Sequence, residues 1–195
     1  MTTDNVWENR YQMGQTGWDR GETSANLLHW TETGLLIPCR ILIPGCGNGY
    51  EVLTLAEKGF DVIAIDIAST PLEKLTKSLQ TNKLTADLVL ADFMTWQPEK
   101  KIDAIYEQTS LCALDPEHWQ AYEQRLHNWL KPKGKLFAQF MQSEQEGGPP
   151  FHCDIDEMRI LFSSQRWHWS EQHQTQVIHS SGKYEKLYCL EKLGQ

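Results

Sequence analysis

The sequence lacks any long hydrophobic run. No uninterrupted stretch of 18 apolar residues occurs, and the mean hydropathy is −0.52. Because a transmembrane helix needs about 20 consecutive, predominantly apolar residues, the sequence excludes a helix of that kind. We therefore expect no membrane partner.

Cysteine is sparse, and its spacing indicates no pairing. The five cysteines are an odd number, and no two of them form a C-x-x-C pair. Scattered cysteines are typical of free thiols in a reducing compartment rather than of disulfides or a zinc site. The first residues also lack the basic and apolar regions of a secretory signal, so we expect a cytoplasmic protein. The cysteines are Cys39, Cys46, Cys112, Cys153 and Cys189.

Positive charge is in the minority. The chain has 18 Lys and Arg against 26 Asp and Glu, a net charge of −8 and a pI near 5.3. Such a charge repels a polyanion, and no local cluster of basic residues is long enough to reverse the field. We therefore expect no nucleic-acid partner.

Repeats, low-complexity tracts and linkers are also absent. A length of 195 residues is that of one domain, which can bury a core without a disulfide or metal. We predict a single domain over residues 1–195 that acts as a monomer. Residues 1–39, with helices near 4–12 and 24–33, form an N-terminal lid, and residues 40–195 form an α/β core.

Short β-branched runs alternate with helical stretches from residue 40 onward. This alternation predicts an α/β, Rossmann-like fold with a mainly parallel seven-stranded sheet and an N-terminal helical lid. Two strand-like runs near the end predict an antiparallel hairpin that closes the sheet, with its turn at residues 179–182. The predicted strands are residues 40–43, 61–65, 86–90, 102–106, 135–141, 167–177 and 184–190, and the predicted helices of the core are 50–58, 71–79, 116–130 and 154–162.

A glycine-rich turn follows the first predicted strand, in the segment I-L-I-P-G-C-G-N-G at residues 41–49. Glycines let the backbone turn tightly and approach a ligand, and the next helix presents free N–H groups. Tyr50 stands where a dinucleotide-binding fingerprint has its third small residue, whereas G-x-G-x-G is typical of S-adenosylmethionine sites. Gly45 and Gly47 are therefore predicted cofactor contacts, with an ordinary strand-to-helix turn as the alternative.

Acidic residues follow the second and third predicted strands. Asp66 lies about 20 residues after the glycines, where a carboxylate accepts hydrogen bonds from ribose hydroxyls. Asp92 is placed to reach an adenine amino group, and the Phe93 ring to cover the adenine face. The alternatives are a helix N-cap for Asp66, a turn cap for Asp92 and core packing for Phe93.

With these residues in view, the chain resembles the thiopurine S-methyltransferase family, nearly end to end. The G-G-P-P-F and E-K-L-Y segments are more specific than the glycine turn. The resemblance rests on W-E-N-R-Y (7–11), G-W-D (17–19), I-P-G-C-G-N-G (43–49), residues 103–116, G-G-P-P-F (147–151) and Y-E-K-L-Y (184–188).

The resemblance implies a class I methyltransferase fold and S-adenosylmethionine as the cofactor. It also implies that aromatic residues of the lid cover the cofactor, because electron-rich ring faces attract a sulfonium cation and exclude water. The cofactor residues it implies are Trp7, Tyr11, Trp18, Gly45, Asp66, Asp92, Phe93 and Gln108.

Two departures from the family pattern concern the acceptor. Tyr11 stands where relatives often have a second tryptophan. Glu107 and Gln108 stand where the thiopurine branch reads Asp-Arg and the thiol and halide branch often reads Asp-Tyr. Without the arginine, and with T-S-L-C-A at 109–113, the chain looks closer to the thiol, halide and thiocyanate branch.

The predicted function is methyl transfer from S-adenosylmethionine to a small soft nucleophile: a thiol, thiocyanate, a halide or a thiopurine-like sulfur. Phe151 and Tyr184 are candidate walls of the acceptor pocket, with core packing as the alternative, and no catalytic residue is assigned. Adjacent side chains in an extended chain point to opposite faces, so we expect no metal at His152, Cys153 and Asp154. A non-catalytic cofactor-binding protein, a nicotinamide-dependent oxidoreductase and an O- or N-methyltransferase are the alternatives.

Overall fold

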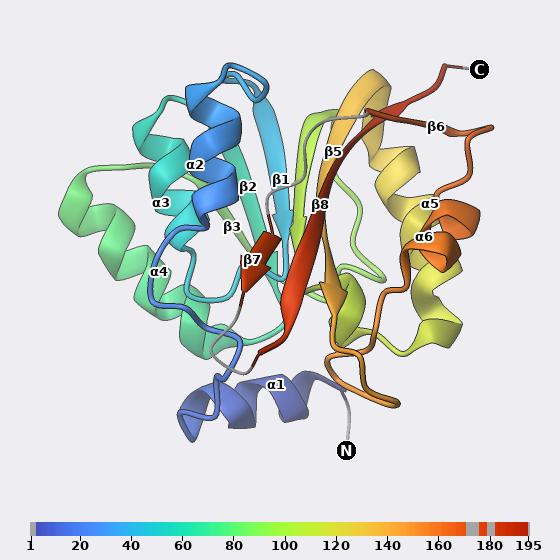
Figure 1. The fold of residues 1–195 in the computed structure, drawn as a ribbon. Coiled ribbons are helices and arrows are strands. Elements are labelled where there is room, and N and C mark those ends of the chain that lie inside the picture. The colour runs from blue at the N-terminus through green and yellow to red at the C-terminus, as the bar shows by residue number, and fades with distance from the viewer. Residues whose placement is uncertain (1–2, 171–175, 179–181, 195) are drawn as a thin grey trace. The chain divides into compact units, whose positions relative to one another are not determined.

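The computed structural model describes residues 3–170, 176–178 and 182–194. The chain divides by its internal contacts into two compact units, Met1–Gln97 and Pro98–Gln195, and each is described by itself (Figure 1). We call them unit 1 and unit 2.

Unit 1 is an α/β unit built on three parallel strands. The strand order is β3-β2-β1, with Ile43 paired to Ala64 and Ile65 paired to Val89. Its elements are α1 (Thr3–Gln12), α2 (Ala25–Glu32), β1 (Arg40–Pro44), α3 (Tyr50–Glu57), β2 (Asp61–Asp66), α4 (Ser69–Asn82) and β3 (Asp87–Leu90).

The core of unit 1 follows from strand and helix patterning. Four of the five residues of β1 and five of the six of β2 are buried, as expected for parallel strands covered on both faces. On α4 the side chains of Leu72, Leu75 and Leu79 recur at helical spacing and are buried, so the helix packs one apolar face inward.

Helix α1 crosses the end of unit 1 at which β1 and β2 finish (Figure 1). The chain then returns to the core at Ser24, the N-cap of α2, whose hydroxyl oxygen accepts from the Asn26 N–H. The Ser24 N–H in turn donates to the Glu51 carboxylate of α3 at 2.9 Å. The N-terminal segment is thereby joined to the α/β core by hydrogen bonds.

Unit 2 contains one parallel strand pair and a set of antiparallel strands. Strands β4 and β5 are parallel, with Tyr106 opposite Phe137, and β8 runs antiparallel to β5, with Tyr188 opposite Ala138. The elements are β4 (Ile102–Gln108), the 3-10 helices η1 (Leu111–Ala113) and η2 (Pro116–His118), α5 (Trp119–Trp129), β5 (Leu130–Gln142), α6 (Ile155–Leu161), β6 (Trp167–Trp169), β7 (Gln176–Ile178) and β8 (Tyr184–Lys192).

The predicted fold class is confirmed, and two strand bounds need correction. The predicted strand 167–177 is two short strands, β6 and β7, and both pair antiparallel with β8. Of the predicted turn at 179–182, residues 179–181 lie outside the described residues. Strand β5 begins at Leu130, five residues earlier than predicted, because a register shift opposite Asp103 accommodates Pro132 and Gly134.

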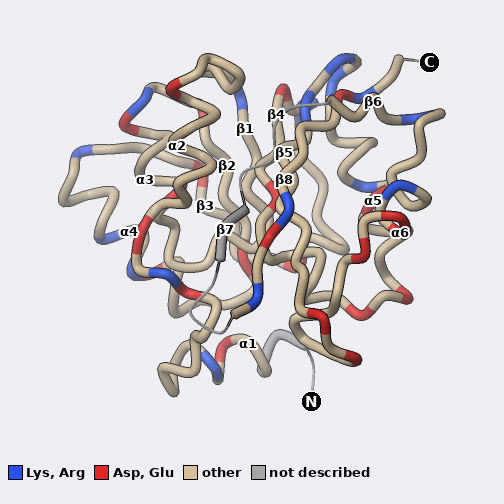
Figure 2. The backbone as a smooth tube through the Cα atoms, in the orientation of Figure 1, with Lys and Arg blue, Asp and Glu red and all other residues tan. Residues whose placement is uncertain are grey.

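Charged residues of both signs are dispersed over both units. Figure 2 shows Lys and Arg interspersed with Asp and Glu, for example along α4. Within the described residues, no helix is both long and apolar enough to cross a membrane. None of the five cysteines, all of which lie in the described part of the chain, forms a disulfide, and only Cys39 is not buried.

Candidate active site

The glycine turn after β1 has left-handed backbone at Gly45, Gly47 and Gly49, with φ of 60°, 53° and 74°. Gly49 is the N-cap of α3 and offers no side-chain cap, so N–H groups of the first turn are left for other acceptors. A Cβ on Gly49 would lie 2.5 Å from a methyl carbon of Leu75. The third glycine therefore permits close packing of the turn against α4.

An aromatic cluster from the N-terminal segment lies on this turn. A Cβ on Gly47 would meet the Tyr11 hydroxyl oxygen at 2.8 Å. Trp18 packs edge-on against Tyr11 and Trp7, with ring centroids 5.6 and 5.3 Å apart, and its indole N–H donates to the Tyr11 oxygen at 3.4 Å. The structure thus brings together the three aromatic residues that the resemblance implied, and we call Trp7, Tyr11 and Trp18 the aromatic roof.

The aromatic roof already contacts one cation. The Arg10 guanidinium carbon lies 5.2 Å from the Trp7 ring centroid and 6.0 Å from that of Trp18, a geometry in which ring faces attract positive charge. Burial and the Asp66 carboxylate raise the pKa of Tyr11, so its hydroxyl stays protonated and can donate.

Asp19 joins the N-terminal segment to the glycine turn, a role that the sequence analysis missed. Its carboxylate accepts from the Asn48 amide, from the Tyr50 hydroxyl at 3.5 Å and from the Gly21 N–H at 2.9 Å. The Asn48 Oδ1 atom is buried and accepts no hydrogen bond from the described residues. The only sequence signal was the position of Asp19 in the G-W-D segment.

Asp66 lies at the end of β2, where it was predicted, but its carboxylate is already engaged. It accepts from the Gly47 N–H at 2.8 Å and from the Ala68 N–H at 2.9 Å. Burial raises the pKa of Asp66, and these N–H groups oppose that shift. A carboxylate offers about four acceptor sites, so Asp66 can accept further hydrogen bonds. Contact of Asp66 with ribose hydroxyls stays a prediction.

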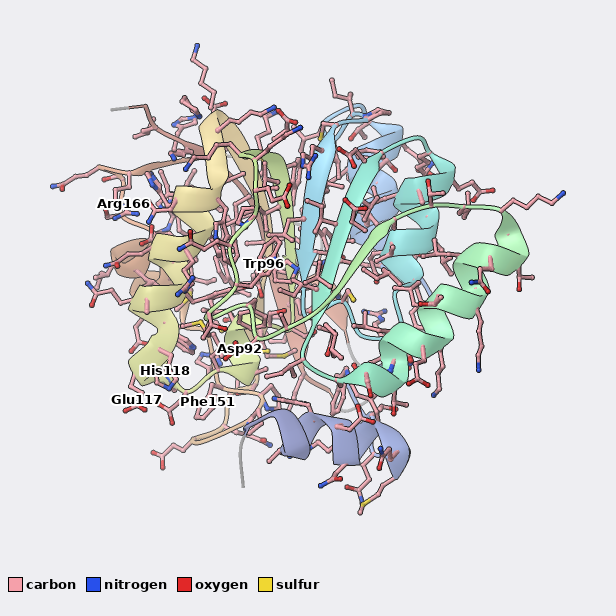
Figure 3. All side chains as sticks on the ribbon, turned by 180° about the vertical axis from the view of Figure 1, so that it is seen from behind. Asp92, Trp96, Glu117, His118, Phe151 and Arg166 are labelled. Carbon is pink, nitrogen blue, oxygen red and sulfur yellow. The ribbon has the colours of Figure 1, made fainter. Side chains whose placement is uncertain are left out.

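Asp92 lies on the segment that follows β3, together with Trp96 (Figure 3). Its carboxylate accepts from the Met94 N–H at 2.7 Å, and its carbonyl accepts from the N–H groups of Thr95 and Trp96. Asp92 therefore does cap a turn. The predicted contacts of Asp92 and Phe93 with adenine remain predictions.

The remaining predicted residues belong to unit 2. The side-chain oxygen of Gln108 accepts from the Tyr106 hydroxyl at 2.7 Å, and the side-chain NH₂ group of Gln108 donates to the Glu185 carboxylate at 2.9 Å. Gln139 donates to the same Tyr106 oxygen at 2.5 Å. Gln108 is thus part of a hydrogen-bonded network, and its contact with a cofactor stays a prediction.

Glu107 is 2% exposed and adjoins this network. One carboxylate oxygen accepts from the N–H groups of Ser110 and Leu111, at 3.1 and 2.7 Å. The other oxygen, Oε2, is buried and has no hydrogen-bond partner in the described residues. Burial raises the pKa of Glu107 to about 7, aided by Glu185 and opposed by the two N–H groups.

Phe151 and Tyr184 have local contacts in unit 2. A Cβ on Gly148 would lie 2.6 Å from the Phe151 ring, so this ring packs against its own loop, and the Phe151 N–H donates to the Cys112 carbonyl at 2.7 Å. The Tyr184 hydroxyl donates to Glu144 at 3.2 Å. Figure 3 places Phe151 in unit 2. Whether both residues line an acceptor pocket stays a prediction.

The H-C-D segment at residues 152–154 has three separate local roles. The His152 Nδ1 atom accepts from the Glu144 N–H, Cys153 is buried, and the Asp154 carboxylate caps α6. Among the described residues no group of three or more His, Cys, Asp or Glu side chains is arranged to hold a metal ion.

The residues of unit 1 fit a sulfonium nucleoside. The aromatic roof contacts a cation, the acidic side chains of Asp19 and Asp66 adjoin the turn, and the Asn48 Oδ1 atom is a buried acceptor that a donor such as an ammonium group would satisfy. Left-handed glycines bring backbone close to such a ligand.

Comparison with known proteins agrees with this fit. The family described as Thiopurine S-methyltransferase matches residues 2–192. A probable thiol methyltransferase 2 of Arabidopsis thaliana is 37% identical over 154 residues, covering 77% of this chain and 68% of that protein. A thiopurine S-methyltransferase of Pseudomonas fluorescens is 27% identical over 215 aligned positions, covering 96% of each chain.

Solved structures show the same fold. A 1,6-didemethyltoxoflavin-N1-methyltransferase of Burkholderia thailandensis superposes with a TM-score of 0.79 at 17% identity, covering 98% of this chain and 87% of that chain. A magnesium protoporphyrin IX methyltransferase of Synechocystis, crystallised with S-adenosylmethionine, gives a TM-score of 0.75 at 14% identity, covering 98% and 97%. The family match and the thiol methyltransferase relative favour methyl transfer over the nicotinamide-dependent alternative. The chain belongs to the thiopurine S-methyltransferase family and is an enzyme that takes its methyl group from S-adenosylmethionine.

Proposed function

We propose that this enzyme methylates the sulfur of a small thiol or of thiocyanate, with the cofactor held between the aromatic roof and the glycine turn. The observation that carries the cofactor site is the Tyr11 hydroxyl, set 2.8 Å from the position of a Cβ on Gly47. The higher identity to a probable thiol methyltransferase than to a thiopurine S-methyltransferase supports the acceptor class. The family match over residues 2–192 supports the action of both units as one domain.

Each predicted residue has a proposed role. The aromatic roof covers the sulfonium, Gly45 and Gly47 present backbone to the cofactor, and Asp66 receives the ribose hydroxyls. Asp92 and Phe93 hold the adenine, Gln108 at the end of β4 contacts the cofactor, and Phe151 and Tyr184 line the acceptor pocket. Hydrogen bonds already hold both polar side chains in place, from the Gly47 N–H to Asp66 and from Gln108 to Glu185, which reduces the entropy lost on binding.

The bound cofactor supplies an activated methyl group on a sulfonium sulfur. The chain's own residues then need to orient the pair and exclude water, which for well-placed reactants lowers a barrier by roughly 7–11 kcal/mol. The Tyr11 hydroxyl, which burial and Asp66 keep protonated, is available at the turn as a hydrogen-bond donor. Soft nucleophiles such as thiocyanate arrive ionised, whereas a thiol must lose its proton, because the thiolate is the reactive form.

The test is incubation of the purified enzyme with methyl-labelled S-adenosylmethionine and a panel of thiols, thiocyanate, iodide and thiopurines. We expect labelled products from thiols or thiocyanate. Product from thiopurines alone would contradict the proposed acceptor class. Binding of S-adenosylhomocysteine without product from any acceptor would contradict methyl transfer to this panel while leaving the cofactor site in place.

We further propose that the enzyme acts as a cytoplasmic monomer without a nucleic-acid partner. The net charge of −8 and the scattered basic residues support the last point. Sedimentation at several concentrations should give one species with the mass of a single chain, and a mass that grows with concentration would contradict the monomer.

The aromatic roof yields a quantitative prediction. Trp18→Ala should weaken binding of S-adenosylmethionine roughly tenfold, because a cation–π contact contributes about 0.5–2 kcal/mol. Binding of S-adenosylhomocysteine, which carries no sulfonium charge, should weaken less. Calorimetry with both ligands measures the difference, and Trp18→Phe, which keeps a ring, is the matched control. Equal losses for both ligands would show that Trp18 does not contact the sulfonium.

A further inference from the structure

The N-terminus of α4 has no cap within its own chain segment. Its N-cap is Ala68, which has no side-chain acceptor, whereas Ser, Thr, Asp or Asn usually fills this position. The N–H groups of the first helical turn have no acceptor inside the helix. An acceptor for them comes either from water or from elsewhere in the fold.

Glu8 of α1 supplies this acceptor, although it lies 62 residues earlier in the chain. One carboxylate oxygen accepts from the Thr70 N–H at 3.1 Å, and the other accepts from the Thr70 hydroxyl. The Gln12 side-chain amide, one turn further along α1, donates to Glu8 at 2.8 Å and holds the carboxylate from its own helix. The Thr70 hydroxyl and backbone N–H lower the pKa of Glu8, so the contact is charge-assisted.

The same helix carries two of the three residues of the aromatic roof. Trp7 adjoins Glu8 in the sequence, and Tyr11 lies on the next turn of α1, with its hydroxyl on Gly47. A displacement of α1 that broke the contact with Thr70 would also move the Tyr11 hydroxyl away from the turn, since a helix moves as a rigid element. The position of the roof and the contact with α4 are therefore coupled.

We propose that the Glu8–Thr70 contact is a latch that holds α1 over the glycine turn and so sets how tightly and how long the cofactor is held. Glu8 is a positioning residue, because it acts through Trp7 and Tyr11 and not on the reacting atoms. This inference rests on the proposed cofactor site. It adds the pair Glu8 and Thr70, which holds the aromatic roof in position over the glycine turn.

The test uses the full chain with Glu8→Ala, Thr70→Val and the double variant, and Thr70→Ser as the matched control that keeps the hydroxyl. Amide hydrogen exchange in α1 is measured without ligand, and the dissociation rate of S-adenosylhomocysteine is measured by stopped-flow tryptophan fluorescence. Glu8→Ala should speed both α1 exchange and dissociation about tenfold, and Thr70→Val about threefold. The double variant should be no faster than Glu8→Ala, because both changes break one contact.

A purely structural role for Glu8 predicts a different result. In that case Glu8→Ala would lower the thermal midpoint of unfolding. The rate of amide exchange in α1, relative to that in β1 and β2, and the rate of ligand dissociation would both equal those of the wild type. This outcome would overturn the latch. If Glu8→Ala folds poorly, Thr70→Val and Glu8→Gln carry the test. Failure of the wild type to bind S-adenosylhomocysteine would refute the cofactor site, whereas unchanged α1 exchange in the variants would refute the latch alone.

Discussion

Replacing Gly49 with alanine should destabilise the enzyme by about 2–5 kcal/mol, the sum of two separate penalties. The left-handed backbone at Gly49, with φ of 74°, disfavours any Cβ by about 1–2 kcal/mol. The added carbon would also lie 2.5 Å from a methyl carbon of Leu75, which is fully buried, so the Leu75 side chain, α4 or the turn must shift. Urea unfolding of wild type and variant measures the loss.

Gly59→Ala is the matched control for this prediction. Gly59, which follows α3, also has a left-handed φ, 84°, but no atom lies within 4 Å of the position of its Cβ. Its replacement should therefore cost only the backbone part, about 1–2 kcal/mol. Equal losses at Gly49 and Gly59 would contradict the argument that packing against Leu75 requires the third glycine.

A second variant isolates the packing contribution. Leu75→Ala alone should destabilise by about 2–5 kcal/mol, since it removes a buried leucine. In the Gly49→Ala background the same change should cost less, because it also relieves the clash. Additive losses would show that the two sites do not interact.

The second prediction with a large effect is that the stability of the folded state depends on pH because of Glu107. Its pKa in the folded state is about 7, against an ordinary value of 4.5, mainly because burial disfavours the charged form. The folded protein therefore binds more protons than the unfolded chain between these values. The contribution of Glu107 to stability is fully present below pH 4.5 and is lost as the pH rises to about 7.

The loss over this window should be about 3 kcal/mol, from 1.36 kcal/mol per pKa unit. Glu107→Gln does not titrate, so the stability of the variant relative to wild type should rise by about that amount between pH 4.5 and pH 8. Urea unfolding at several pH values measures this relative change. Glu146→Gln, at an exposed position, is the control, and its stability should change with pH as that of the wild type does. A difference in stability between Glu107→Gln and wild type that does not change with pH would contradict the prediction.

The glycine turn and the order of strands and helices could be predicted from the sequence because both leave local signals. Buried strands read as short apolar runs, and α4 shows its apolar face at helical spacing. The predicted start of β5 was wrong because Pro132 and Gly134 normally interrupt a strand. In the structure both residues lie inside β5, at a register shift that accommodates them.

The candidate site was predictable in part. The aromatic roof rested on a resemblance, and the structure places its three rings together. The structure gives Asp66 two backbone partners, the N–H groups of Gly47 and Ala68. The sequence left a ligand contact and a local capping role open for Asp66, because an acid at a strand end has the same sequence signal in both cases. Asp19 and Glu8 were missed as joining residues for a similar reason, since a single polar contact between distant segments produces no periodicity.

The sequence by itself determined the α/β class, the glycine turn at the end of β1 and the family, because these depend on local backbone preference, burial pattern and motif. Tertiary structure alone decided which polar side chains meet. Glu8 caps a helix that begins 61 residues later, and Gln108 on β4 bonds to Glu185 on β8. The physical reason is that contacts between distant residues depend on strand pairing and helix docking, which arise only when the whole core is packed.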